Sequence, residues 1–149
     1  ILPQMIVTSR EHPNYNMKIF GYPEWQTYTD DHLASFFELD TYFYSSFYTN
    51  NLFPEAIKFT NAYRKWYSKD MANTFPKYGM LGFDTAFYFL KGMSQYGTNL
   101  EENLNHLRVN PIQTGFKFDR VNNWGGFINR KVFFVHFTKG YELIKIDFE

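Results

Sequence analysis

The sequence predicts a mixed α/β fold, with about three helices packed on a sheet and a β-hairpin at the C-terminal end. Two long segments carry apolar residues at three- and four-residue spacing, which is typical of helices with one buried side. Shorter segments are rich in aromatic and β-branched residues, which favours strands. The last two of these segments flank Thr138-Lys139-Gly140, as expected for a hairpin.

The clearest helix lies between Asp84 and Gly97. We expect Asp84 to cap the first free backbone N–H groups and Gly97 to end the helix in a left-handed conformation. One apolar face is predicted from Ala86, Phe87, Leu90 and Met93, and further apolar surface from Phe83, Tyr88 and Phe89. Because the helix is apolar around most of its circumference, we expect it to be packed between layers.

The remaining helices are predicted from weaker patterns. A helix over 55–71 has an apolar stripe that contains Phe59, Ala62, Tyr63 and Trp66. A shorter helix begins at Asn99, which forms a capping-box pattern with Glu102, and ends before Pro111. Residues 1–8 are expected to form the tail of a helix, and Asp30 or Asp31 to cap a short helical turn.

Strands are expected over 17–20, 40–48, 116–118, 132–137 and 141–148. An aromatic loop covers 22–28, and a polar turn covers 120–126. In the second strand, one interpretation turns the hydroxyl groups of Tyr42, Tyr44 and Tyr48 towards a cleft while Phe43 and Phe47 pack. The other interpretation makes all of these residues ordinary packing aromatics of a sheet.

Composition restricts the classes of function. The chain has 149 residues, enough for one domain with its own core, and we treat 1–149 as a single domain or fragment. Lysine plus arginine equals aspartate plus glutamate at 15 each, so no charge field favours nucleic acid or a membrane surface. There is no cysteine, and no apolar run is long enough to span a membrane. Aromatic residues are abundant, with 18 Phe, 12 Tyr and 3 Trp.

The sequence does not predict an enzyme. His12, His32, His106 and His136 are scattered without metal-ligand spacing, so we assign no metal, no cofactor and no catalytic residue. The motifs of serine hydrolases, zinc proteases and phosphate-binding loops are missing from the sequence.

The order of several short motifs resembles a known family. Gly21-Tyr22-Pro23-Glu24 follows a strand, Pro54-Glu55 opens a long helix, and Tyr78-Gly79-Met80-Leu81-Gly82-Phe83-Asp84 leads into the next helix. Gly115-Phe116-Lys117-Phe118-Asp119 and the closing hairpin then complete the order. This order is similar to the C-terminal half of a type I periplasmic binding protein of the branched-chain amino-acid receptor type. More narrowly, it resembles the receptor-like domain behind LysM modules in envelope proteins of Gram-negative gut bacteria.

The resemblance implies a ligand site. The family's loop reads Gly-Pro-Glu, and its glutamate holds the ammonium group of the ligand. By resemblance, Glu24 is expected to bind a cationic group, Trp25 to form an apolar wall, and Tyr22 and Tyr42 to lie near the ligand. This chain has one residue inserted, Tyr22, so the register departs from the family's pattern. The alternative is a surface glutamate beside a packed tryptophan.

Two functions are expected from these observations. The first is a non-catalytic, receptor-like module of the periplasm or cell envelope, associated with peptidoglycan, that binds an amino acid or a cell-wall fragment. The second is a structural or protein-interaction module, or a glycan-binding module that uses Trp25, Trp66 and Trp124. Because the chain opens at Ile1 without a start methionine, we expect a fragment of a longer protein. An isolated half would expose apolar surface and is expected to self-associate.

Overall fold

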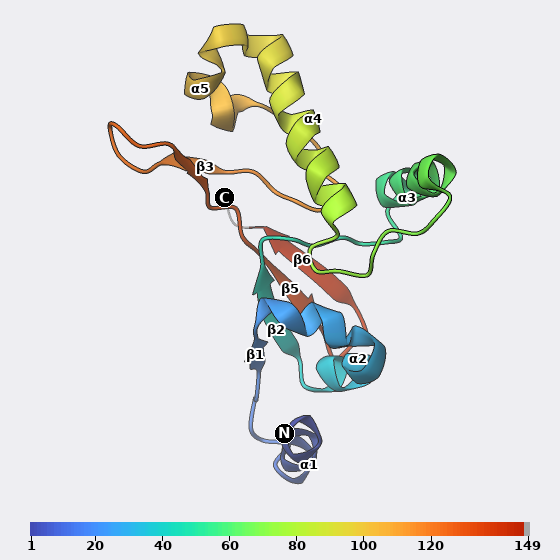
Figure 1. Cartoon of the computed structure of the whole chain (residues 1–149). Helices are drawn as coiled ribbons and strands as arrows, with labels where there is room; N and C mark the ends of the chain where they lie inside the picture. Colours follow the sequence, from blue (N-terminus) through green and yellow to red (C-terminus); the bar gives the residue numbers. More distant parts are fainter. Residues whose placement is uncertain (148–149) are drawn as a thin grey trace. The chain divides into compact units, whose positions relative to one another are not determined.

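The computed structural model describes residues 1–147, apart from the side chain of Asp30 (Figure 1). The described chain is mixed α/β, as predicted, but it has five α-helices in place of about three, and two sheets. It divides into two compact units. The first unit contains Ile1–Ser45 and the chain from Val132 onward, and the second unit contains Ser46–Lys131.

The first unit is built on a four-stranded sheet. Its strands are β1 (Ile19–Gly21), β2 (Thr41–Ser45), β5 (Phe133–Phe137) and β6 (Leu143–Asp147), in the order β1-β2-β5-β6. β1 and β2 are parallel, and the other pairs are antiparallel. The β5–β6 pair confirms the predicted hairpin, although the predicted end of its last strand at Phe148 lies outside the described residues.

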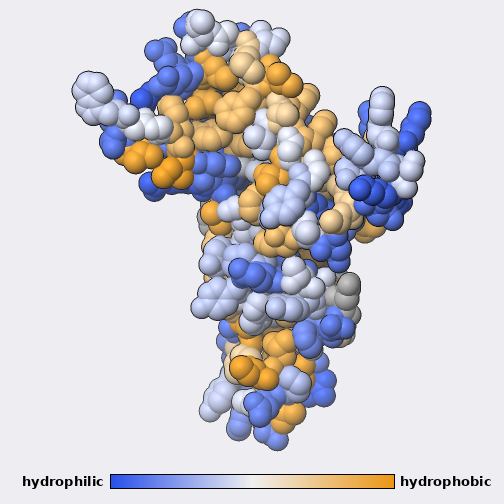
Figure 2. All heavy atoms as spheres, viewed as in Figure 1, coloured by the Kyte–Doolittle hydropathy of each residue, from blue (hydrophilic) through white to orange (hydrophobic). Residues whose placement is uncertain are grey.

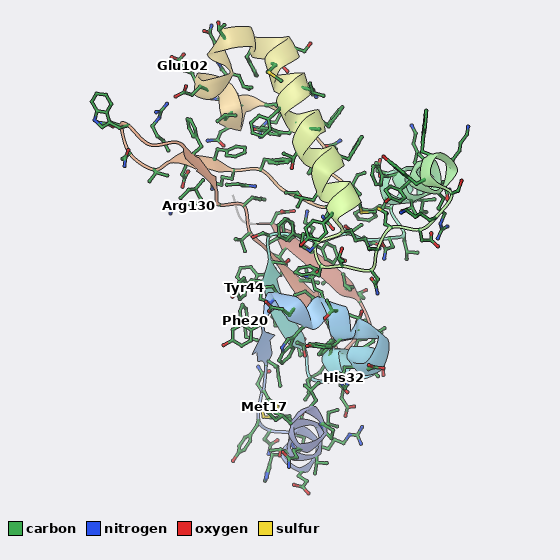
Figure 3. All side chains as sticks on the ribbon, viewed as in Figure 1. Met17, Phe20, His32, Tyr44, Glu102 and Arg130 are labelled. Atoms are coloured by element: carbon green, nitrogen blue, oxygen red, sulfur yellow. The ribbon has the colours of Figure 1, made fainter. Side chains whose placement is uncertain are left out.

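The two faces of this sheet differ. On one face, β2 and β5 place buried side chains in alternation: Thr41, Phe43, Ser45, Phe133, Val135 and Phe137. The helix α2 (Thr29–Glu38) covers this face through Phe36, whose ring lies 5.6 Å from that of Phe137. The opposite face carries Phe20, Tyr42, Tyr44, Phe134 and His136, and we call it the open face. Figure 3 shows Phe20 and Tyr44 projecting side by side from neighbouring strands.

Two helical segments of the first unit differ from the sequence predictions. The helix α1 covers Leu2–Glu11, and its Arg10 pairs with Glu38 of α2 at 2.6 Å. The predicted loop over 22–28 is instead a 3-10 helix, η1 (Pro23–Tyr28). η1 continues directly into α2, where the Thr29 hydroxyl donates to the carbonyl of Gln26. The predicted aspartate cap is therefore wrong, because the chain is already helical before Asp30.

The second unit contains two long helices and a small hairpin. α3 spans Pro54–Tyr67 and α4 spans Tyr78–Tyr96; the hairpin pairs β3 (Phe118–Arg120) with β4 (Phe127–Asn129). Short helical turns connect α4 to the hairpin: η2 (Gly97–Asn99), α5 (Leu100–Asn103) and η3 (Leu104–His106). α3 ends before the predicted residue 71, because Ser68 takes a left-handed conformation with φ of 54°. The predicted strand at 116–118 is shifted to β3, and β4 was not predicted.

Asp84 is not a helix cap, which corrects the prediction. α4 begins at Tyr78, so Asp84 lies inside the helix and only 2% of its surface is exposed. Its carboxylate accepts three backbone N–H bonds, from Ile112 at 2.8 Å, Gln113 at 2.7 Å and Thr114 at 2.9 Å. Asp84 therefore anchors a distant loop to the middle of α4.

The core of the second unit lies between α4 and the segment that follows it. Tyr88, Leu104 and Leu107 are buried, and Phe116 and Phe118 pack against them. The Tyr88 hydroxyl donates to the carbonyl of Leu104, and burial raises the pKa of this tyrosine, so it stays a hydrogen-bond donor.

The end of α4 at Gly97 and the start of the next helix at Asn99 were both predicted from the sequence. Gly97 ends α4 with a positive φ of 56°, but its ψ of −126° is not that of the predicted left-handed conformation. The predicted capping box is wrong, because the Asn99 side chain makes no capping bond to α5. α5 is only four residues long and is flanked by 3-10 turns, so its N-terminus is not the free helix end that such a box would satisfy.

One side of α4 is apolar and exposed. Phe83, Phe87, Leu90 and Met93 are between 44% and 63% exposed, whereas the opposite side, with Met80 and Tyr88, is buried. Figure 2 shows hydrophobic residues gathered over the part of the molecule that contains α4. The prediction that this stripe packs between layers is therefore wrong for the described residues. No helix among residues 1–147 combines the length and apolar character needed to cross a membrane.

Candidate functional site

Tyr22 and Glu24 lie where β1 ends, at the carboxyl end of the parallel β1–β2 pair. Tyr22 is extended, with φ of −83° and ψ of 161°, so the side-chain alternation of β1 continues through it. This alternation places Tyr22 on the same side as Phe20, and the side chain is 68% exposed. Glu24 follows in the first turn of η1 and is also exposed. In open α/β sheets, ligands bind at such carboxyl ends of strands.

Trp25 faces the other way. Its indole stacks on Phe36 at 5.6 Å, and a Cβ atom on Gly21 would lie only 2.4 Å from the indole ring. Trp25 therefore packs over the bare backbone of Gly21, on the covered side of the sheet. The expectation that Trp25 forms a ligand-facing wall is wrong, because its ring belongs to the packing between η1, α2 and β1.

The open face of the sheet carries a group of aromatic rings. Phe20 stacks on Tyr44 with ring centroids 6.1 Å apart and contacts Phe134 at 5.4 Å. Phe20 is 59% exposed and Tyr44 is 37% exposed. The register pairs Tyr44 with Phe134, so the three rings form one surface across β1, β2 and β5. We refer to Phe20, Tyr44 and Phe134 as the aromatic patch.

Tyr42 belongs to a polar cluster at the amino end of β1 and β2, beside the carboxyl end of the antiparallel strand β5. The His136 Nε2 atom lies 2.6 Å from a carboxylate oxygen of Asp40, and the two side chains are only 14% and 15% exposed. Tyr42 stacks on the His136 ring at 3.8 Å. The Lys18 ammonium lies 3.7 Å from Asp40 and 3.4 Å from the Tyr42 hydroxyl. This arrangement joins β1, β2 and β5 just before the parallel strands begin.

The four predicted residues therefore do not line one site. Tyr22 and Glu24 lie together at the carboxyl end of β1, Trp25 packs on the covered face, and the ring of Tyr42 is covered by His136. Tyr42 and Tyr44 are on the open face and Phe43 is buried, an alternation that agrees with both interpretations of this strand. Burial raises the pKa of Tyr48 to about 12, so this residue is not the freely exposed tyrosine expected for a cleft.

Phe20 and Phe134 are the members of the aromatic patch that sequence reasoning missed. The signal was available in part, since both alternate with buried positions of their own strands. Their proximity depends on a pairing between segments more than a hundred residues apart, which no local pattern reveals.

The described side chains contain no group of three or more His, Asp or Glu residues suited to hold a metal ion. Comparison with protein-family models, with curated proteins and with solved structures gives no match.

Proposed function

We propose that the chain is a non-catalytic ligand-binding module of the bacterial periplasm or cell envelope. In this proposal it forms the C-terminal half of a type I periplasmic-binding-protein-like domain in a peptidoglycan-associated, LysM-type protein. The ligand is a small molecule with an ammonium group and an apolar part, such as an amino acid or a cell-wall peptide fragment. The observation that carries the proposal is the exposed carboxylate of Glu24 at the carboxyl end of β1. The open face of the same sheet bears the aromatic patch.

The chemistry of this edge supports such a ligand. Glu24 has its carboxylate in solvent, and the hydrogen bond recorded for this residue uses its backbone carbonyl, which accepts from the Thr27 hydroxyl at 2.7 Å. An ammonium group can therefore approach the carboxylate without first displacing a partner cation. The rings of Phe20 and Tyr44 offer apolar surface that is still exposed, so a ligand that covers them gains the free energy of apolar burial.

The substitution Glu24→Gln tests the proposal. It removes the negative charge but keeps the size of the side chain, so affinity for an ammonium-bearing ligand should fall at least about tenfold. Ligands are first found by thermal shift with free amino acids and soluble muropeptides, because binding to the native state raises its stability. Affinities are then measured by calorimetry.

The matched control for this experiment is Glu11→Gln, which changes an exposed glutamate at the end of α1. Glu11→Gln should leave every affinity unchanged. Equal affinity of the Glu24→Gln variant for all ligands found would contradict the role of Glu24. A panel in which no compound raises the melting temperature would favour the alternative, a structural or interaction module.

We also propose that the isolated chain self-associates through α4. Phe83, Phe87, Leu90 and Met93 form one exposed apolar stripe, and Phe59 of α3 extends it through a ring contact with Phe83 at 5.0 Å. Two copies that pair along this stripe would remove it from water. Size-exclusion chromatography with light scattering should give a dimer or larger species, and Phe87→Glu with Leu90→Glu should give a monomer. A wild-type monomer at high concentration would contradict this proposal.

A further inference from the structure

The second unit contains a groove that is separate from the proposed ligand site. Two adjoining hollows of about 480 and 580 Å³ lie between the α5–η3 segment and the β3–β4 hairpin. They share Glu101, Leu104, Arg120 and Phe127 as their common wall. Both volumes fall in the range of ordinary ligand sites.

Each hollow has its own chemical character. The larger is mainly apolar and is lined by Phe89, Leu100, Phe127 and Trp124. The smaller is lined by three carboxylates, Glu101, Glu102 and Asp119, together with Arg120 and His106, and we call it the acidic hollow. A ligand that fills both must therefore place an apolar group beside a cationic group.

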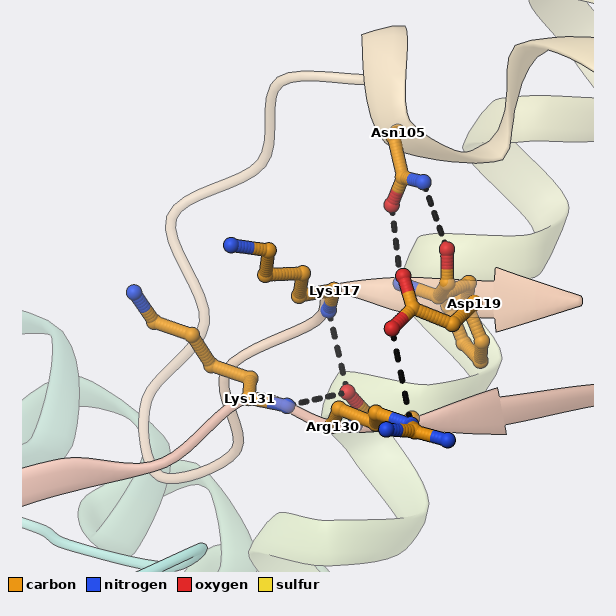
Figure 4. A network of polar contacts seen from close by, with 7 residues as sticks. Asn105, Lys117, Asp119, Arg130 and Lys131 are labelled. Carbon is orange, nitrogen blue, oxygen red and sulfur yellow. Dashed lines mark hydrogen bonds and ion pairs between the residues drawn. The ribbon is translucent and has the colours of Figure 1, made fainter. Parts of the chain in front are cut away.

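Hydrogen bonds fix the wall of the acidic hollow (Figure 4). The Asn105 amide donates to the carbonyl of Phe118 at 2.6 Å and accepts from its N–H at 2.8 Å, which ties η3 to β3. Arg130 lies 3.4 Å from Asp119 and compensates its charge. The groove is therefore already shaped before any ligand binds.

The groove already holds one cation. The guanidinium of Arg120 lies 4.7 Å from the ring centroid of Phe127 and forms an ion pair with Glu101. A cationic group placed between an aromatic face and a carboxylate is favourable for electrostatic reasons. This internal contact shows which chemistry the walls accept.

A second aromatic ring and a second carboxylate of the groove remain exposed. Trp124 is 99% exposed, and its backbone N–H is held by the side chain of Asn122 at 2.9 Å. Among the described residues, Glu101 and Asp119 have ion-pair partners, whereas Glu102 is exposed and has none. The lining therefore has one uncompensated negative charge and one uncovered indole.

We propose that this groove binds a peptide segment in which an apolar residue is followed by a lysine or arginine. The apolar side chain packs in the hollow of Phe89, Leu100 and Trp124. The cationic side chain lies in the acidic hollow beside Glu102. The site does not depend on Glu24 or on the aromatic patch, which belong to the first unit.

The test uses the whole chain and a defined probe, the peptide acetyl-Leu-Lys-Leu-Lys-amide. Binding is followed by NMR through the indole N–H signals of the three tryptophans. The signal that is lost in Trp124→Ala should be the one that shifts. Trp124→Ala and Glu102→Gln should each weaken binding about three- to fivefold, as expected for an exposed apolar contact with the indole and for an exposed ion pair, respectively.

Two controls make the outcome decisive. Trp66→Ala removes another exposed tryptophan, at the end of α3, and should leave the affinity unchanged, as should Glu24→Gln. Replacing both lysines of the probe by glutamine should weaken binding at least about three- to fivefold. Equal binding of the glutamine probe, unchanged affinity in Trp124→Ala, or binding of N-acetylglucosamine oligomers without binding of the basic probe would overturn the proposal.

Discussion

Replacing Asp84 by alanine should lower the free energy of unfolding of the second unit by about 3 to 5 kcal/mol. The substitution removes the acceptor of three backbone N–H groups, at Ile112, Gln113 and Thr114, two of which belong to buried residues. Each buried N–H group that loses its acceptor is left with an uncompensated desolvation penalty. Because whole domains are stable by only about 5–15 kcal/mol, this loss should be visible as a large shift of the urea midpoint.

The matched control is Asp70→Asn. Asp70 pairs with Arg64 at the end of α3, but both side chains are more than half exposed, so this pair should contribute less than about 1 kcal/mol. Urea unfolding followed by circular dichroism compares the two variants. A loss in Asp84→Ala no larger than in Asp70→Asn would show that the three contacts do not hold the loop to α4.

Replacing Gly21 by alanine should destabilise the first unit by about 2 to 3 kcal/mol. The new Cβ would lie 2.4 and 2.5 Å from atoms of the Trp25 ring, far inside contact distance. The ring has little room to move, because Phe36 stacks on it and α2 covers Phe36. The clash should therefore be relieved only by displacing η1 from the sheet, which thermal unfolding measures as a lower midpoint.

Gly140→Ala is the control in the same unit. Its Cβ would meet only the Thr138 hydroxyl oxygen at 3.6 Å, an ordinary contact, so stability should change by less than about 0.5 kcal/mol. If Gly21→Ala were as stable as Gly140→Ala, the close packing of Trp25 on β1 would be wrong. Trp25 would then again be available as a ligand-facing wall.

Local sequence patterns were sufficient to predict features that depend on residues within one strand, helix or hairpin. A strand was predicted over 40–48, and β2 lies within it, with Phe43 buried and Tyr42 and Tyr44 on the opposite face. The helix end at Gly97 follows from the freedom of glycine to take positive φ. The β5–β6 hairpin follows from two alternating segments around a turn.

Local sequence patterns gave wrong predictions where contacts with a segment distant in the sequence determine the structure. Aspartate is a common helix-capping residue, but the partners of Asp84 lie 28 to 30 residues later in the chain. A local sequence pattern does not include such distant partners. The glycines before Asp84 do not interrupt α4, because Gly79 lets the helix lie against Tyr63 and Met71. A Cβ there would lie 3.1 to 3.2 Å from those side chains, so tertiary packing overrides the weak helix propensity.

The candidate site was predictable only in part for the same reason. Tyr22 and Glu24 are only two residues apart in the sequence, so their common position after a strand could be predicted from the motif. The direction of Trp25 depends on the absence of a side chain at Gly21 and on the ring of Phe36. The aromatic patch depends on the register of β1, β2 and β5, which is set by side-chain packing across the whole sheet.

The central claim is that a ligand carrying an ammonium group binds at the carboxyl end of β1, where Glu24 supplies the charge. Calorimetric titration of one amino acid or muropeptide into wild type, Glu24→Gln and Glu11→Gln tests this claim most directly. The account predicts a dissociation constant that rises at least about tenfold in Glu24→Gln alone. The same dissociation constant in all three proteins would contradict it.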